Sequence, residues 1–257
     1  MTRFGTRVIL LLMANLSPRQ IKILKSLVEE FIESAKPVGS DTLEKKYNFG
    51  VCPATLRNEM VYLTRAGYLK KDHSSAGRRP TSMGLKFYVR ELMTQKKLSV
   101  AEEVGVKEKI WDYKADFDNL LKEATKELAK RTRKMSLAAT TQGGLYCSGM
   151  ANLLDEPEYF DIDVTKTTLS LLDQVDFWFK LMDNLFSSHQ AETEAIHLLV
   201  GQDLGMEFLE PCGFVYQDYE GGPYKGIIGV MGPARLPYQE VVPMVNYFAK
   251  LLSEVGK

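Results

Sequence analysis

The first part of the chain alternates apolar and polar residues with the period of a helix. Ser17-Pro18-Arg19-Gln20 combines an N-cap hydroxyl, a proline at the first helical position and a glutamine able to close a capping box, so a helix should begin here. Its inward-facing residues recur at steps of three and four: Ile21, Leu24, Leu27, Val28 and Phe31. Lys36-Pro37 ends the pattern.

Two shorter helices are predicted next. Ser40 is placed to cap the first of them, with Asp41 in the favourable first turn. Pro53 opens the second, which ends before Gly67. At 100° per residue the second helix has two distinct faces: Leu56, Met60 and Leu63 on one, and Ala54, Asn58, Val61 and Arg65 on the other. The first set is expected to be buried and the second exposed.

The pattern then changes to short extended stretches. Tyr68 to Lys71 is typical of a strand, Ser74 to Thr81 of a loop, and Met83 to Met93 of a further helix. Three short helices followed by a strand and a basic loop is the order of a winged helix-turn-helix domain.

The rest of the chain mixes helical and strand-like patterns. Residues 96–107 are polar and interrupted by Gly105, which predicts a domain boundary, and a long amphipathic helix should follow, with Ile110 inward, and end near Lys134. Further helical stretches are 149–154, 168–186 and 238–253, and β-like runs are 196–200, 208–216 and 224–230. We therefore expect an α+β protein with a tail at 1–16, a winged helix-turn-helix domain at 17–98 and an α+β domain at 107–257.

Charge is divided unequally between these two parts. The whole chain has 33 Lys and Arg against 33 Asp and Glu, but residues 1–98 carry 18 against 8, and residues 99–257 carry 15 against 25. A basic module joined to an acidic one indicates that the first part binds a polyanion.

Cysteine usage and hydropathy point to a cytoplasmic protein. Cys52, Cys147 and Cys212 are far apart and lack CxxC spacing, so neither a disulfide framework nor a zinc cluster is expected. The apolar run of residues 8–13 is too short to span a bilayer and has no cleavage site after it, so no membrane span or signal peptide is predicted.

Catalytic patterns are scarce. The chain has neither GxxxxGK[ST] nor GxGxxG, and the glycines of GIIGVMG (Gly226, Gly229 and Gly232) are interpreted as strand and turn positions. His73, His189 and His197 form no zinc-hydrolase motif, and the acidic pairs Asp155-Glu156 and Asp161/Asp163 are typical of solvated loops. No cofactor, metal site or enzymatic activity is expected.

The third helix, by contrast, offers side chains suited to DNA. In the major groove Asn58 can hydrogen-bond adenine, Arg57 can hydrogen-bond guanine, and Ala54 and Val61 can meet a thymine methyl group. Thr55 suits a phosphate near the helix start. The alternative is that Arg57 and Asn58 only solvate an exposed face.

The basic loop extends this candidate site. Gly77 lets the chain turn and Pro80 stiffens it, so Arg78 and Arg79 at the tip or return of a wing can reach phosphate or the minor groove. His73 and Ser75 are weaker candidates in the same loop.

Three segments of the first part resemble the N-terminal domain of the HrcA family of heat-inducible transcription repressors: LSPRQIKILKSLVEEFIESAKPVGSDTL, VCPATLRNEMVYLTRAGYL and HSSAGRRPTSMGLKFYV. Three more resemble its GAF-like domain: NLLDEPEYFDI, VGQDLGMEFLEPCGFVYQDY and GIIGVMGPARLPYQEV. The resemblance implies a nucleoid-associated homodimer that binds an inverted-repeat operator, the CIRCE element, ahead of chaperone genes. It also implies that a GroEL-type chaperonin maintains the active state.

The chain departs from the family in two places. The family carries many more residues between the long helix and NLL, including strands and a dimerisation subdomain, so a GAF-like domain with a reduced sheet is expected here. Cys52-Pro53 replaces the small hydroxyl residues usual at the start of the third helix, which removes a cap or a phosphate contact.

Two alternatives remain open. The second domain can instead bind a small molecule that controls DNA affinity, with Phe214, Tyr216, Tyr219 and Tyr224 lining a pocket. The shortened chain can also be a DNA-binding adaptor that has lost regulation.

Overall fold

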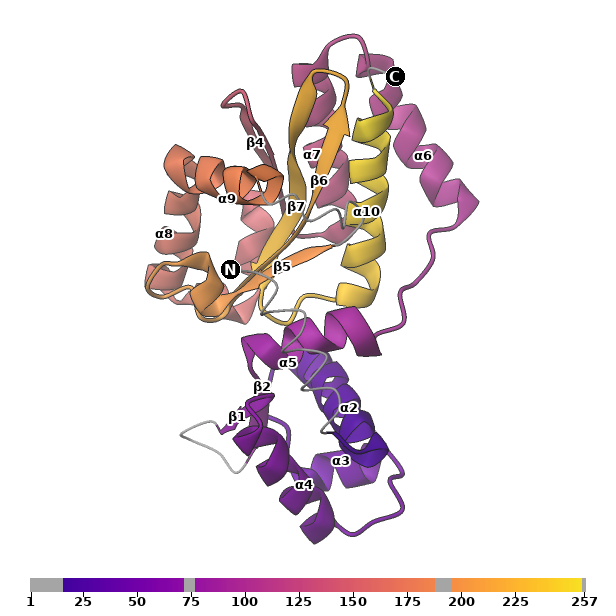
Figure 1. The fold of residues 1–257 in the computed structure, drawn as a ribbon, viewed down its shortest axis with the longest axis vertical. Helices are drawn as coiled ribbons and strands as arrows, with labels where there is room; N and C mark the ends of the chain where they lie inside the picture. Colours follow the sequence, from indigo (N-terminus) through magenta and orange to yellow (C-terminus); the bar gives the residue numbers. More distant parts are fainter. Residues whose placement is uncertain (1–15, 72–76, 188–195, 256–257) are drawn as a thin grey trace. The chain divides into compact units, whose positions relative to one another are not determined.

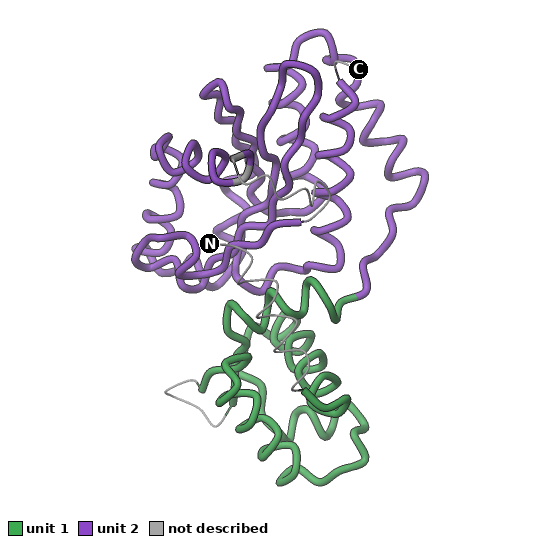
Figure 2. Tube along the Cα trace, viewed as in Figure 1, with its two compact units in different colours: residues 1–93 green, residues 94–257 purple. Residues whose placement is uncertain are grey.

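Figure 1 shows the computed structural model of the protein, which describes residues 16–71, 77–187 and 196–255. The chain divides into two compact units, residues 1–93 and 94–257, coloured separately in Figure 2. Helices occur together with antiparallel strands in both units, which confirms the α+β class.

In unit 1, helix α2 (Pro18–Ser34) begins where the sequence predicts. The Ser17 hydroxyl accepts a hydrogen bond from the Gln20 backbone at 3.3 Å, and Gln20 Oε1 accepts one from the Ser17 backbone at 2.8 Å, which completes the capping box. Ala35, with φ 57°, ends the helix. The buried residues are Ile23, Leu24, Ser26, Leu27, Val28, Glu30 and Phe31, whereas Ile21 is only half-buried.

Helix α3 (Ser40–Lys46) starts one residue earlier than predicted. Gly39 occupies the N-cap position, and Ser40 is the first helical residue, buried and hydrogen-bonded to Asp41 Oδ1 at 3.3 Å. The prediction that Ser40 caps this helix is wrong, because a hydroxyl inside the first turn no longer lies below the free backbone N–H groups.

Helix α4 (Pro53–Arg65) leads into a two-stranded ribbon. Gly67, with φ 84°, turns the chain into β1 (Leu69–Lys71), which pairs antiparallel with β2 (Arg78–Pro80). The expected loop of Ser74–Thr81 is therefore wrong at its end, where Arg78, Arg79 and Pro80 form the return strand. The pairing partner of that strand, not its own sequence, determines this conformation.

A helix closes unit 1 against this ribbon, in agreement with the prediction for residues 83–93. Thr81 Oγ1 accepts a hydrogen bond from the Gly84 backbone at 3.1 Å and caps α5 (Ser82–Phe87), which continues into a π-helical turn, η1 (Tyr88–Leu92). The fully buried side chains around which the unit packs are Leu24, Leu27, Leu43, Leu56, Leu63, Tyr68, Leu85 and Tyr88.

Unit 2 begins with a helix where the sequence predicted a boundary segment. Ser99 and Glu102 form a capping box, and α6 (Val100–Ile110) runs through Gly105. A 3₁₀ turn, η2 (Trp111–Tyr113), separates it from α7 (Phe117–Thr132), which Asp116 caps. The single long helix expected there is thus two helices. The weak amphipathicity of α6 explains why its periodicity did not reveal it.

The sheet of unit 2 has five antiparallel strands in the order β4-β3-β7-β6-β5. Three were predicted: β5 (His197–Val200), β6 (Cys212–Gly221) and β7 (Tyr224–Pro233). The other two, β3 (Met135–Thr140) and β4 (Leu145–Ser148), were not. All six residues of β3 are buried and several are small, so no alternation of apolar and polar residues marks the strand.

Helices cover both faces of this sheet (Figure 1). Helix α10 (Tyr238–Glu254) and α7 pack on one face. On the other lie α8 (Ile162–Ser170), α9 (Val175–Ser187) and the 3₁₀ turns η3 (Met150–Asp155), η4 (Pro157–Phe160) and η5 (Leu171–Asp173). Between β5 and β6, the 3₁₀ turn η6 (Gly201–Leu204) adds Leu204 to the same core.

The glycines of GIIGVMG lie in β7, as predicted. A Cβ added at Gly226 would lie 2.1 Å from the Ala139 carbonyl oxygen of one neighbouring strand, and one at Gly229 would lie 2.4 Å from the Val215 carbonyl oxygen of the other. These positions therefore serve close packing of the sheet. Within the described ranges, no helix is long and apolar enough to cross a membrane.

Candidate nucleic-acid interface

The buried face of α4 lies as the sequence predicts, and its opposite face is exposed at Ala54, Asn58 and Arg65 but not at Val61. Leu56, Met60 and Leu63 are at most 3% exposed and fill the core of unit 1. On the opposite side Ala54, Arg57 and Asn58 are exposed, while Thr55 and Val61 are half-buried. The helix thus offers solvent a strip of short side chains, a guanidinium and an amide.

The start of α4 carries a thiol. Cys52 is the N-cap residue, Pro53 follows it at the first helical position, and the Cys52 side chain makes no capping hydrogen bond. Its sulfur lies 3.4 Å from Thr55 Oγ1, and this hydrogen bond lowers the pKa of the exposed Cys52 thiol. The expected loss of a side-chain cap at the start of α4 is confirmed, because the Cys52 side chain makes no capping hydrogen bond.

Glu59, the residue after Asn58, is hydrogen-bonded through its carboxylate to a side chain of α2. Gln20 Nε2 donates to Glu59 Oε2 at 2.9 Å, while the other end of the same amide closes the capping box of α2. Arg19 Nη1 lies 3.9 Å from Glu59 Oε1. One glutamine therefore connects the start of α2 to the middle of α4. The sequence suggested the capping role of Gln20 but not this contact, because residues 39 positions apart meet only in the tertiary fold.

The ribbon brings four cations together. Lys70 pairs across the strands with Arg79, and Lys71 pairs with Arg78. Both lysines are exposed and both arginines are half-buried, with Arg78 Nη1 donating to the Gly77 carbonyl at 3.2 Å. Arg78 and Arg79 thus lie on the return strand. Lys70 and Lys71 were not selected from the sequence. Their position in a predicted strand directly before a basic loop would have been enough to include them.

Two candidates of the basic loop, His73 and Ser75, lie outside the described residues. Of the eight proposed DNA-binding residues, five therefore belong to α4 and two to β2. The described residues of unit 1 carry 14 Lys and Arg against 7 Asp and Glu, so the surface around these residues attracts polyanions.

In unit 2 the two cysteines and His197 occupy structural positions. Burial raises the pKa of the Cys147 thiol to about 12 and also raises that of Cys212. The His197 ring stacks on Tyr216, with its Nε2 3.7 Å from Asp218 Oδ1. Across the part of the chain that the structure describes, no three His, Cys, Asp or Glu side chains gather as metal ligands would.

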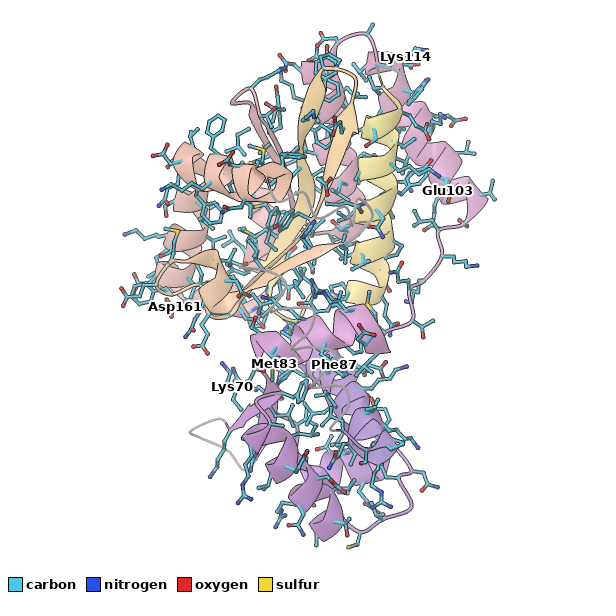
Figure 3. All side chains as sticks on the ribbon, in the orientation of Figure 1. Lys70, Met83, Phe87, Glu103, Lys114 and Asp161 are labelled. Carbon is cyan, nitrogen blue, oxygen red and sulfur yellow. The ribbon has the colours of Figure 1, made fainter. Side chains whose placement is uncertain are left out.

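One acidic pair differs from its prediction. Glu156 is 8% exposed and paired with Lys134 and Arg235, so the expectation of a solvated loop charge is wrong for this residue. Asp161, labelled in Figure 3, caps α8 by accepting a hydrogen bond from the Asp163 backbone at 2.9 Å.

The aromatic residues considered for a ligand pocket are packing residues. Phe214, Tyr216 and Tyr219 are at most 3% exposed, and Tyr224 stacks on Phe117 with ring centroids 3.7 Å apart. A small pocket lies instead between the β3–β4 turn and α9, and none of these four residues lines it. The small-molecule alternative is therefore not favoured.

Comparisons with known proteins agree on one family. A family model described as "HrcA protein C terminal domain" matches residues 83–242. The "Heat-inducible transcription repressor HrcA" of Pelotomaculum thermopropionicum is 27% identical, with 94% of this chain and 97% of that protein covered. The protein of the same name from Carboxydothermus hydrogenoformans is 24% identical, with 92% and 97% covered.

The length of these alignments agrees with a shortened chain. The Pelotomaculum alignment spans 342 positions and this chain has 257 residues, so at least 85 positions face gaps in it. A solved structure described as "a hypothetical protein at 2.2 A resolution" has a TM-score of 0.70 and 18% identity, covering 94% of this chain and 99% of that one. At that identity the likeness is one of fold.

Proposed function

The chain belongs to the HrcA family, and from this premise we propose that it is a repressor of heat-shock genes that binds a CIRCE-like inverted repeat. One observation carries the proposal: the outward face of α4 presents Arg57 and Asn58 on a unit whose adjoining ribbon holds four cations. Base-edge hydrogen bonding and phosphate neutralisation are the two things that specific DNA binding requires.

In this proposal residues 17–98 form a winged helix-turn-helix domain with α4 as the recognition helix. Arg57 pairs with a guanine and Asn58 with an adenine, because their side chains match those bases in the major groove. Ala54 and Val61 contact thymine methyl groups and Thr55 a phosphate. Arg78 and Arg79, with His73 of the intervening loop, form the wing.

Residues 107–257 form a GAF-like regulatory domain that holds two chains together as a homodimer. Support comes from the five-stranded sheet with helices on both faces. An inverted repeat has two-fold symmetry, so a symmetric dimer places one α4 in each half-site, with centres about 34 Å apart. Acting on the chromosome, the protein works in the cytoplasm at the nucleoid.

The first test is binding of the full chain to duplex DNA. The probe is the inverted repeat found upstream of the chaperone genes of the same genome, and the control is a duplex of equal composition with both half-sites shuffled. We expect binding at least about 1,000-fold tighter to the intact repeat at one fixed salt concentration. Equal affinity for the two duplexes would refute sequence-specific repression.

The proposal also includes tuning by a GroEL-type chaperonin. A reporter behind the operator measures this: depleting the chaperonin should relieve repression, and restoring it should return repression. Constant repression under depletion would contradict chaperonin tuning and favour an unregulated adaptor, while leaving the DNA-binding assignment intact.

A further inference from the structure

We propose that two copies of the chain associate through helix α6, which pairs antiparallel with α6 of the second copy. The inference rests on the proposed function, because it names the surface through which the proposed homodimer forms. It concerns unit 2 alone, and none of the residues involved belongs to the candidate nucleic-acid interface.

Helix α6 has an exposed apolar stripe beside its buried one. Val106 and Ile110 are at most 1% exposed and face the body of unit 2, where α6 packs on α7. Val100 and Val104, by contrast, are 77% and 47% exposed. At 100° per residue the two pairs point in directions about 120° apart. The valines therefore point away from the core, on a helix that lies at the outer side of the unit (Figure 1).

The exposed stripe has the spacing of a coiled-coil seam. Val100, Val104, Lys107 and Trp111 follow one another at steps of four, three and four residues, which keeps them on one side of the helix. Trp111 directly follows the last residue of α6 and is half-buried, with Lys107 Nζ 4.5 Å from the centroid of its ring. A single lysine among apolar seam positions lowers stability but fixes the register in which two helices pair.

The charges of this segment favour a second copy as the partner. Residues 100–106 carry two Glu and no Lys or Arg, whereas residues 107–114 carry three Lys against one Glu and one Asp. Figure 3 labels one charge of each group, Glu103 and Lys114. An antiparallel copy places the acidic part of each helix beside the basic part of the other. A parallel copy places like charges together, so the antiparallel arrangement is the one that fits.

This arrangement brings specific side chains together. When the stripes are aligned, Val100 faces Trp111 of the partner subunit, and Val104 faces Lys107 of the partner subunit. The lysine stem covers the valine, and its ammonium extends toward Glu103 or Glu108, which flank Val104 on the helix surface. In the single chain Lys107 Nζ lies 3.5 Å from Glu254 in an exposed pair, which costs little to replace.

A second apolar surface of unit 2 fits a copy of itself poorly. Leu154, Phe160 and Ile162 are exposed on η3, η4 and α8. Residues 150–187, however, carry eight Asp and Glu against two Lys. Two such acidic surfaces repel each other. Helix α6, which carries both signs of charge, is therefore the better surface for self-association.

The experiment is sedimentation velocity of the full chain over a range of concentrations, with wild type, Val104→Lys and Val104→Glu. Val104→Lys places two lysines opposite each other twice in the dimer, so the dissociation constant should rise by about 100-fold, about tenfold for each copy. Val104→Glu instead faces a lysine and should raise it by about tenfold or less. In a parallel pair residue 104 faces its own counterpart, and the two variants would weaken the dimer alike.

A matched control tests the second surface. Phe160→Lys makes the same kind of exchange at an exposed residue of η4 and should leave the dissociation constant unchanged. Circular dichroism and thermal unfolding, measured where wild type is monomeric, separate loss of association from loss of fold. Since Val104 lies outside the core of the single chain, its variants should unfold as wild type does.

The outcomes separate this inference from the proposed function. An unchanged dissociation constant for Val104→Lys, or loss of the dimer in Phe160→Lys alone, would overturn α6 as the interface. Equal weakening by Val104→Lys and Val104→Glu would overturn the antiparallel pairing. In these cases the homodimer itself stands. If wild type stays monomeric over the whole range and binds the inverted repeat as a single chain, the homodimer is refuted and this inference with it.

Discussion

Arg57 and Asn58 are adjacent on α4 and both exposed, and together with Arg79 they allow base reading to be separated from phosphate binding. Arg57→Ala should weaken operator binding by about 1 to 3 kcal/mol and relax discrimination at one base pair per half-site. Arg79→Ala should weaken binding evenly across sequences and reduce the salt slope by about 1. Competition binding against single-base operator variants measures both effects. Unchanged affinity in both protein variants would contradict the site assignment.

Gln20 and Glu59 offer a second test at the residue scale, because each supplies one half of a single hydrogen bond. Gln20→Glu keeps a side chain that can close the capping box, but it places two carboxylates beside each other. Adding Glu59→Gln restores the hydrogen bond with the roles reversed, because residue 59 then donates and residue 20 accepts. The double variant should recover stability, with a coupling free energy of about 0.5 kcal/mol or more in a denaturant-unfolding cycle. Strictly additive effects would show that the contact does not link α2 to α4.

At the scale of elements, α6 has the least expected position. Gly105 lies in its interior, where a Cβ would approach only the flexible end of Arg131, at 3.2 Å. Gly105→Ala should therefore stabilise unit 2 by about 0.5 to 1 kcal/mol, since alanine loses less backbone entropy than glycine in a helix. Thermal or denaturant unfolding of the full chain measures this, and no change would indicate that the segment is not helical in solution.

How far the sequence predicts each element depends on where its determinants lie. Helices α2 and α4 were predicted because Ser17 with Gln20, and Pro53 with Gly67, mark their ends locally. Strand β2 was taken for a loop because its conformation depends on pairing with β1. Likewise, β3 carries no alternating pattern because both of its faces are buried.

The candidate site, too, can be predicted only in part from the sequence. Periodicity alone separates the buried face of α4 from its exposed face, so Arg57 and Asn58 can be found from sequence. The hydrogen bond between Gln20 and Glu59 and the cross-strand partners of Lys70 and Lys71 require the tertiary fold, and no local pattern records them.

At the scale of the whole molecule, a basic unit, which we propose binds DNA, is joined in the chain to an acidic unit. A buried ion-pair network contributes to that second unit. Arg235 Nη2 lies 2.6 Å from Glu156 Oε2 and its Nε lies 2.7 Å from Glu158 Oε1, while Lys134 also pairs with Glu156. The network joins the start of β3, the η3–η4 segment and the residues after β7.

This network makes the stability of unit 2 depend on pH. Burial disfavours the charged form of Glu156, but hydrogen bonds and charges from Lys134 and Arg235 outweigh it, so the pKa of Glu156 lies below its ordinary value. A carboxyl with a lowered pKa stabilises the fold above its unfolded pKa of about 4.3, and this contribution is lost as the pH falls through the folded value.

Glu156→Gln should therefore destabilise the protein by about 3 kcal/mol at pH 7, because it removes the carboxylate paired with Lys134 and one of the two carboxylates paired with Arg235. The difference from wild type should shrink below about pH 4, where wild type also becomes protonated. Denaturant unfolding across this pH range measures it. Glu220→Gln, in the exposed pair with Lys225, is the control and should cost less than about 1 kcal/mol. A difference that does not change with pH would contradict the role of the network.

In the proposed function, the outward face of α4 reads base edges in the major groove of an inverted repeat. Protection of guanine N7 from methylation by dimethyl sulfate tests it most directly, since that atom lies in the major groove. Bound wild-type protein should protect guanines symmetrically in both half-sites, and Arg57→Ala should lose one protected guanine in each. Absence of protection in the bound complex, or an identical pattern with Arg57→Ala, would contradict the account.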